Sequence, residues 1–370
     1  MRTTIFFLFL TSFLMGQTTH QHSRTITFPD IPGHFTLVSD LHQHTVFSDG
    51  NVWPTIRIEE AIRDGVDLIS LTEHLEYQPH LQDIPHPDRN RSYQLALAEA
   101  KSKNVVVIAG SEITRNLPPG HNNAIFIEDA NQLLVEDSIE VFRAAQAQGA
   151  FVFWNHPNWI AQEKNGIAKI TPTQQYLIDN GLLHGIEVVN EHTFSEEALQ
   201  LALDHNLTIM ATSDIHGLID WQFEVNDGGH RPVTLIFTPT KDLEAIKKAL
   251  FDRQTVAYFN NYLIGRAEFL EPLVKSCLII KEASFIGNST VAKITIENKS
   301  NAPFILLNKS SYTFHEHADL IEIPASGTID LSVKTLGNNK NIILPFEVMN
   351  GIIAPKKYAN IILEVDINSF

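Results

Sequence analysis

The segment VSDLHQHTVFSDG, residues 38–50, places two histidines and several acids directly after an apolar run. His42 and His44 are two residues apart, so on a strand their side chains share a face and can address one ion. Asp40 precedes the pair and could orient a histidine, while Asp49-Gly50 follows in a turn. The segment alone also fits a solvated polar loop, so the rest of the chain must decide between the two interpretations.

Short apolar runs recur between about residues 35 and 265 and alternate with amphipathic stretches such as 54–65 and 196–206. Several of these stretches end on Gly or Asn, which are typical helix C-terminal signals. The alternation predicts an α/β domain, with a βα barrel favoured over a doubly wound open sheet. The predicted strands are FTLVSD, DLISLTEH, VVVIAGSE, NAIFIE, AFVFWNHP, GIEVVNEH and TIMATSDIH.

Most of these runs end in an acid or a histidine. Because parallel strands of a barrel or an open sheet place their carboxyl ends together, polar residues distant in sequence should converge there. Cys277 is the only cysteine, so a transition-metal site would have to use histidines and carboxylates. One such run would be unremarkable, but several together favour a metal site. The candidate ligands after the first segment are His74, Glu112, His121, His156, Asp214 and His216, and Glu73 directly precedes His74.

The motifs DLHQHTVFSDG, LTEH, GSE, NHP and SDIH occur in this order from residue 38 onward, and the combination resembles the polymerase and histidinol phosphatase (PHP) superfamily of metal-dependent phosphoesterases. The resemblance implies a distorted (β/α)7, TIM-like barrel and two or three divalent metal ions, which would be Zn, Mn or Fe. One departure is Glu73, where many relatives have Asp before the histidine; another is Asp49, where some relatives have His. The implied ligand sets are His42, His44, Glu112 and Asp214 for one ion, Glu112, His121 and His156 for a second, and Asp49, His74 and His216 for a third.

Such ions would turn bound water into a nucleophile for a phosphate ester, with Glu112 as a bridging carboxylate and Asp214 as a further catalytic residue. The sequence contains no Gly-x-Ser-x-Gly segment that would suggest a covalent nucleophile. Arg115 and Arg231 could each clamp a phosphoryl oxygen, although Arg231 could equally close the barrel through a salt bridge. His192, with the neighbouring Asn190, could contact substrate or a bound water.

Several other residues are weaker candidates for metal binding or substrate contact. His184 and His192 are rivals for a ligand position. Three tryptophans, Trp154, Trp159 and Trp221, lie near the expected mouth of the site, where packing is the simpler interpretation and a stacking platform the alternative.

The sequence pattern changes after about residue 270, where apolar and polar residues alternate and Asn, Ser and Gly interrupt the alternation. This pattern predicts a small all-β sandwich over residues 269–370, after a barrel domain over 25–268. His315 and His317 could form a second metal site there, but an exposed strand edge is the simpler interpretation.

The first residues combine a charged start with a short apolar core, which predicts a signal peptide over residues 1–16 and a secreted or periplasmic protein without stable membrane insertion after cleavage. A membrane anchor or a buried strand is the alternative. The net charge of −16 argues against binding of long nucleic acids. An oligomer is compatible with the sequence.

Together these features predict a secreted metal-dependent phosphoesterase acting on small-molecule phosphomonoesters or phosphodiesters. Two alternatives stay open. One is a surface or glycan-binding protein with a non-catalytic barrel, and the other is a metal-dependent hydrolase of a non-phosphate bond.

Overall fold

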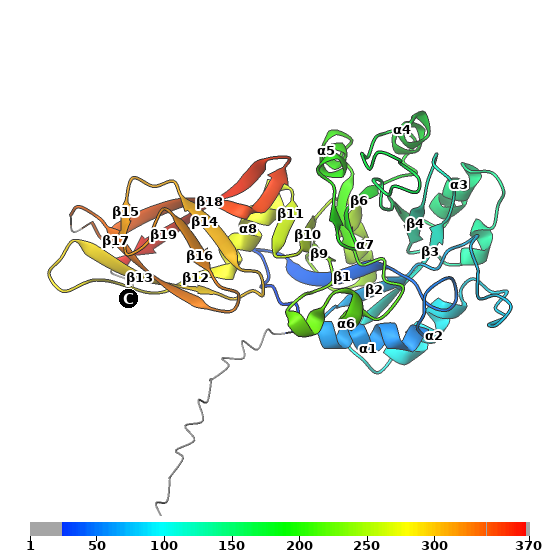
Figure 1. Cartoon of the computed structure of the whole chain (residues 1–370), viewed down its shortest axis with the longest axis horizontal. Coiled ribbons are helices and arrows are strands. Elements are labelled where there is room, and N and C mark those ends of the chain that lie inside the picture. Colours follow the sequence, from blue (N-terminus) through cyan, green and yellow to red (C-terminus); the bar gives the residue numbers. More distant parts are fainter. Residues whose placement is uncertain (1–23, 338, 368–370) are drawn as a thin grey trace, which may run out of the picture.

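The computed structural model describes residues 24–337 and 339–367, so the predicted signal peptide lies outside the described residues. Two lobes lie side by side along the long axis of the molecule (Figure 1). An α/β lobe comes first in the chain, and an all-β lobe follows it. In the part of the chain that the structure describes, no helix is both long enough and apolar enough to span a bilayer.

The segments predicted as strands of the α/β lobe are all strands in the structure. β1, β2 and β3 run parallel to one another, as do β5, β6 and β8. Between these two sets, β4 runs antiparallel to both of its neighbours. The strands are β1 (Phe35–Gln43), β2 (Leu68–Leu71), β3 (Val106–Ile113), β4 (Asn122–Ile125), β5 (Phe151–Trp154), β6 (Gly185–Asn190) and β8 (Thr208–Thr212), with the short β7 (Thr193–Phe194) paired to β6.

Three further strands follow that the helix–strand alternation did not predict. β9 (Val233–Thr238), β10 (Thr255–Phe259) and β11 (Tyr262–Gly265) form an antiparallel meander, and β9 pairs antiparallel with β1. β8 meets this meander through side chains, since the hydroxyl groups of Thr234 and Thr255 donate to carbonyl oxygens of β8 at 2.8 Å. The sheet is therefore mixed, and the predicted α/β class holds without the regular (β/α)7 strand pattern.

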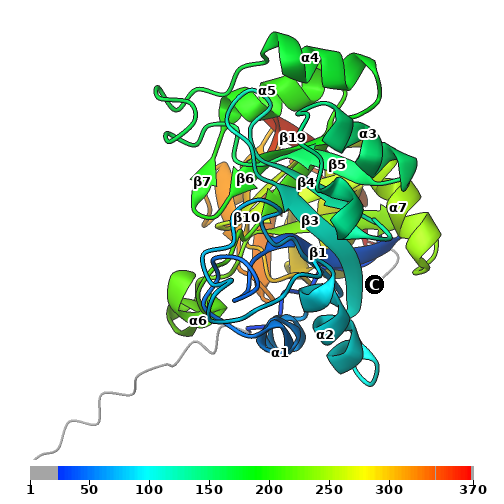
Figure 2. The same ribbon diagram turned by 90° about the vertical axis from the view of Figure 1, so that its right-hand side faces the viewer.

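The helices surround these strands (Figure 2). α1 (Pro54–Asp64) illustrates why they form where they do: a proline opens its first turn, and Gly65 ends it at φ +72°, a left-handed conformation that glycine adopts without strain. Buried Ile58 and Ala61 form its apolar face. The others are α2 (Arg91–Ala100), α3 (Glu140–Ala147), α4 (Pro172–Asp179), α5 (Glu196–Asp204), α6 (Ile219–Gln222) and α7 (Leu243–Phe251), with 3-10 turns η1 (Ala130–Leu133) and η2 (Val225–Asp227).

Buried apolar side chains from β1, β2, β5, β8 and β9 form one contiguous cluster within the α/β lobe. Leu41, Leu68, Phe153, Met210 and Ile236 belong to it and are almost completely inaccessible to solvent. Such a close-packed interior resists small displacements of the strands. The polar residues at the strand ends are therefore held on a stiff support.

The all-β lobe consists of two packed sheets. One contains β12 (Leu278–Phe285), β13 (Val291–Asn298), β17 (Thr328–Lys334) and β15 (Thr313–His315), and the other contains β16 (Leu320–Ile323), β14 (Phe304–Asn308), β18 (Asn341–Ala354) and β19 (Lys357–Asp366). Alternate residues point into a shared apolar core that includes Ile294, Phe304, Leu331 and Phe346. The sandwich prediction agrees with this arrangement.

The helix α8 (Ala267–Cys277) precedes the sandwich, whereas the sequence pattern after about residue 270 predicts strands without a helix. Its buried residues Leu270, Leu273, Val274 and Cys277 belong to the same apolar cluster as the sandwich core. The predicted domain boundary between residues 268 and 269 falls at the start of this helix and stays a prediction.

Candidate metal centre

The structure brings all of the expected metal ligands together at the carboxyl ends of strands in the α/β lobe. His42 lies in β1 and Glu112 in β3, and the rest are residues that follow β1, β2, β5 and β8 or precede β4. The deepest ligands are fully buried, whereas the side chains of Asp49 and His216 are 23% and 32% exposed. The cluster is thus embedded in the protein and open on the side of Asp49 and His216.

The first group consists of His42, His44 and Asp214. Oδ1 of Asp214 lies 3.1 Å from Nε2 of each histidine, and the two Nε2 atoms are 3.0 Å apart. The carboxylate oxygens of Glu112 lie 3.7–3.8 Å from the same nitrogens. These atoms face a common point, as the ligand set inferred for the first ion requires.

Glu112 lies at the centre of the cluster. Its Oε1 is 3.0 Å from Nδ1 of His121 and 3.7 Å from Nε2 of His156, while its Oε2 is 2.5 Å from Nδ1 of His74. A carboxylate reached from several sides by imidazole nitrogens is placed to bridge two ions. The geometry therefore agrees with the bridging position inferred for Glu112, and it adds His74 to the neighbours of Glu112.

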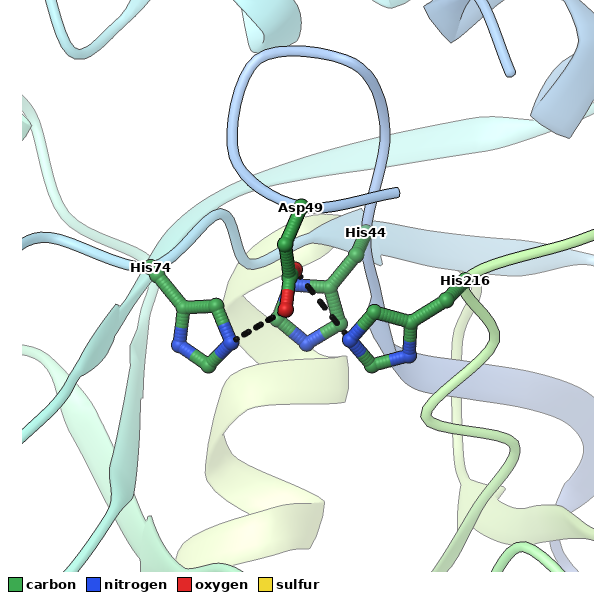
Figure 3. Close-up of side chains that lie close together, drawn as sticks. All are labelled: His44, Asp49, His74 and His216. Atoms are coloured by element: carbon green, nitrogen blue, oxygen red, sulfur yellow. Dashed lines mark ion pairs between the residues drawn. The ribbon is translucent and has the colours of Figure 1, made fainter. Parts of the chain in front are cut away.

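The third group surrounds Asp49 (Figure 3). Its carboxylate lies 3.4 Å from Nε2 of His74 and 3.2 Å from Nε2 of His216. The ring of His44 stacks between those two rings, with centroid distances of 4.5 and 4.3 Å, and its Nδ1 is 3.8 Å from Asp49. His44 therefore also belongs to this group, whereas the ligand set inferred for the third ion does not contain it.

Glu187 is a buried acid of β6 that the sequence analysis did not single out. Nδ1 of His42 donates to its Oε1 at 2.7 Å, and the backbone N–H of His156 donates to its Oε2 at 2.6 Å. The side chains of Thr212 and Asn190 donate to the same carboxylate at 2.6 and 2.9 Å. An acid inside an otherwise apolar strand was the available signal, because charged residues are rarely buried without a partner.

Two other acids near the ligands, Glu73 and Asp40, hold the surrounding backbone in place. Glu73 accepts hydrogen bonds from the backbone N–H of Thr45 and the hydroxyl of Ser48, at 3.0 and 2.6 Å, and so braces the loop that carries Asp49. Asp40, expected to orient a histidine, instead accepts from the backbone and hydroxyl of Ser213. Asn190 donates to Asp214 at 3.1 Å, so it holds a candidate ligand in place.

The two arginines proposed as phosphate clamps are both engaged elsewhere. Arg231 is buried and pairs with Asp64 at 2.5 Å and Asp40 at 3.2 Å, so the salt-bridge alternative is correct and the clamp is not. Arg115 pairs with Glu76 at 2.7 Å and donates to the carbonyl oxygens of residues 135 and 136. These contacts use three of the five N–H groups of the guanidinium and fix its position.

Neither of the rival histidines joins the cluster. His192 is exposed and packs against Phe223, with 5.0 Å between the ring centroids. His184 accepts from the backbone N–H of Val152 and donates to the carbonyl oxygen of Gly181, both at 3.0 Å. His315 and His317 are likewise outside every candidate metal group in the described part of the chain.

The electrostatics of the cluster suit a cation. Burial alone would lower the pKa of His42, but the carboxylates of Asp214 and Glu187 raise it well above the usual value. Burial and the neighbouring ring of His74 lower the pKa of His44 to about 3. Burial would raise the pKa of Glu112, yet the surrounding histidines hold it well below its usual range. Anionic oxygens and imidazole nitrogens are therefore concentrated in one small volume.

Unsatisfied buried atoms test whether divalent ions fit this donor set. Among the described residues, Oε2 of Glu112, Oδ1 of Asp49 and Nδ1 of His121 are buried and form no hydrogen bond, although each lies 2.5–3.2 Å from an atom of another candidate ligand. Such atoms are costly unless something else binds them, and histidine nitrogens with carboxylate oxygens suit Zn, Mn or Fe. His156 and Asp214 also hold positive φ angles of 29° and 48°, a strained backbone that is common at functional sites. The residues present fit two or three divalent ions.

One solved structure is similar to almost the entire chain. It is a two-domain protein from Bacteroides vulgatus ATCC 8482 that contains a predicted PHP-like metal-dependent phosphoesterase. The sequences are 40% identical, the match covers 92% of this chain and 98% of the other, and the TM-score is 0.86. A family model described as an Ig-like domain (DUF5001) matches residues 278–364, which form the all-β lobe.

Two more distant structures each match 48% of this chain and 87% of their own. One is a putative metal-dependent phosphoesterase from Bifidobacterium adolescentis ATCC 15703, at 17% identity and a TM-score of 0.39. The other is an amidohydrolase from Chromobacterium violaceum, at 16% identity and a TM-score of 0.35. Both scores are too low to support a functional argument. No curated protein matches the chain.

Proposed function

The chain belongs to the PHP-like metal-dependent phosphoesterases, and from this premise we propose that it hydrolyses small-molecule phosphomonoesters or phosphodiesters outside the cytoplasm. The observation that carries the proposal is the cluster of histidines and carboxylates around Glu112, in which buried atoms are left for ions to bind. The alternative of a non-catalytic barrel would be favoured by a missing ligand, and every expected ligand lies in the cluster.

The three groups indicate which residues would hold each ion. His42, His44 and Asp214 would hold one, and His121 and His156 a second, with Glu112 between them. Asp49, His74 and His216 would hold a third, with His44 close by. When bound, such ions supply charge neutralisation for the phosphate oxygens, a lowered pKa for water and stabilisation of the leaving oxygen.

The protein's own part in the reaction is to hold these groups in place and to admit the ester from one side. Hydrolysis forms a bond from a water oxygen to phosphorus, breaks the bond from phosphorus to the alcohol oxygen, and delivers a proton to that oxygen. Asp49 and His216 are the ligands most open to solvent, so the phosphoryl group enters past them. The side chains of His42 and Glu112 are fully buried and offer no route from solvent.

The engagement of both arginines favours a diester over a monoester. A monoester dianion gains from additional cationic side chains, whereas a diester carries a single negative charge that the ions can neutralise. Arg115 and Arg231 are each paired with acids, so their positive charges are already balanced within the protein. Zn, Mn and Fe all suit the donor set. The proposed location outside the cytoplasm rests on the predicted signal peptide alone.

The proposal is tested by elemental analysis and a substrate panel on the same purified sample. We expect two or three divalent ions per chain, and metal-dependent hydrolysis of bis(4-nitrophenyl) phosphate with less of 4-nitrophenyl phosphate. Chelation should abolish both activities, and adding back Mn or Zn should restore them. Glu112→Gln should lose most of the activity together with bound metal, because it weakens two sites at once.

The matched control is Glu163→Gln, because Glu163 pairs with Lys169 at 2.9 Å and is not a candidate ligand. Less than one ion per chain, with no turnover after Mn or Zn is supplied, would contradict the proposed function. Wild-type turnover in Glu112→Gln would show that the bridging position is wrong.

A further inference from the structure

We propose that Trp159 and Tyr77 form an aromatic rim that binds the organic group of the phosphate ester, so that esters of planar, aromatic alcohols are preferred. This inference rests on the proposed function and narrows its substrate class. It concerns the residues beside the metal centre rather than the ligands themselves.

Both rings lie directly against candidate metal ligands. The ring of Trp159 is 5.1 Å from that of His156 and 5.6 Å from that of His121, and the ring of Tyr77 is 5.7 Å from that of His74. A phosphoryl group held at the cluster must place its ester substituents within a few ångströms of these histidines. The two aromatic side chains are therefore within reach of the substituent.

Both side chains also remain open to solvent, since Trp159 is 45% exposed and Tyr77 is 53% exposed. Isolated exposed apolar residues are ordinary on protein surfaces. Two exposed aromatic rings that each touch the rings of candidate ligands are a different case, because burial in the core does not account for their position.

The loops that carry these rings are tied to one another by Arg115. Its guanidinium pairs with Glu76, the residue before Tyr77, at 2.7 Å. Its backbone carbonyl oxygen accepts a hydrogen bond from Gln162, three residues after Trp159, at 3.0 Å. The backbone N–H of Trp159 donates to the carbonyl oxygen of His156 at 2.9 Å, which fixes the start of that turn. Arg115 thus braces the rim.

The structure also separates the three tryptophans that the sequence left equivalent. Trp154 is buried in β5 and is part of the apolar core. Trp221 lies on α6 with 78% exposure, and among the described residues no ring contact joins it to a candidate histidine, unlike Trp159. Trp159 alone of the three combines exposure with contact to the cluster, so it is the one suited to a stacking platform.

The test compares aromatic with non-aromatic ligands on metal-loaded protein. Aromatic pairs add a contribution that corresponds to roughly a threefold to tenfold change in affinity. We expect Trp159→Ala to lower kcat/KM for bis(4-nitrophenyl) phosphate and to weaken phenylphosphonate binding by that factor. Methylphosphonate binding and metal content should stay unchanged, Trp159→Phe should retain most of the preference, and Tyr77→Ala should act in the same direction.

Trp221→Ala is the matched control, since it removes an exposed indole that does not touch the cluster. Equal weakening of phenylphosphonate and methylphosphonate, or no change in either, would overturn the aromatic rim. If neither the wild type nor any variant turns over an ester, the proposed function fails instead. The phenylphosphonate-to-methylphosphonate affinity ratio, measured by calorimetry, still decides on the rim in that case.

Discussion

Glu187 acts on the metal centre without belonging to any candidate ligand group. Four donors converge on its carboxylate, from the imidazole of His42, the backbone of His156 and the side chains of Thr212 and Asn190. An ionised carboxylate only accepts hydrogen bonds, so it is the side chain that can satisfy all four. It also keeps the proton of His42 on Nδ1, which leaves Nε2 free to bind an ion.

At this scale we predict that Glu187→Gln loses one ion per chain while the protein stays folded. The amide NH2 group of glutamine would face hydrogen-bond donors, and His42 would lose its anionic partner. Affinity for the ion at His42, His44 and Asp214 should fall roughly tenfold to a hundredfold. Elemental analysis after dialysis against graded free metal measures this, with Glu163→Gln as the control. Unchanged stoichiometry at every metal concentration would show that Glu187 does not orient His42.

The loop between β1 and α1 shows how one element joins two ligand segments. Gly50 donates to the carbonyl oxygen of Thr45 at 2.9 Å, and Asn51 donates to that of His216 at 2.8 Å. From α1, the buried Arg57 donates to the carbonyl oxygens of His44 and Ile215 at 2.9 and 3.1 Å. The turn that carries Asp49 is therefore fastened to the ends of both β1 and β8.

For this element we predict that Gly50→Ala displaces Asp49. A Cβ atom at residue 50 would lie 2.7 Å from backbone atoms of His44 and Thr45, and backbone cannot move aside as a flexible side chain can. We expect a loss of about 1–3 kcal/mol in the free energy of unfolding, which is typical of overpacking, and weaker binding of the ion at Asp49. Thermal unfolding with and without metal measures both. Gly217→Ala, where nothing lies within 4 Å of the added atom, should behave like the wild type.

The two lobes share one sheet and one apolar core. β11 of the α/β lobe pairs parallel with β18 of the sandwich at Leu263 and Ile264. Asn350 is buried beside this junction and donates to the carbonyl oxygens of Asn261 and Pro303, both at 2.8 Å. Because backbone hydrogen bonds and apolar contacts cross between the lobes, neither can separate without exposing buried surface.

At the scale of the molecule we therefore predict a single cooperative unfolding transition. Asn350→Ala should lower the free energy of unfolding by about 1–3 kcal/mol for each buried backbone group left unsatisfied, and the transition should stay single. Differential scanning calorimetry measures both, with the exposed Asn360→Ala as the control. Two well-separated transitions in the wild type would show that the lobes unfold independently.

The sequence by itself determined the α/β class, the strands that carry the ligands and the sandwich that follows. Those features depend on local patterns: period-two alternation, helical periodicity and polar residues at strand ends. It did not determine the antiparallel β4, the meander of β9 to β11 or the position of α8, because strand direction and pairing depend on partners distant in the chain. Likewise, only the tertiary structure decided the partners of Glu187, the stacking of His44 between the rings of His74 and His216, and the burial of Arg231. Whether a charged side chain binds substrate or closes the interior depends on which distant residues fold against it, and a linear pattern does not contain that information.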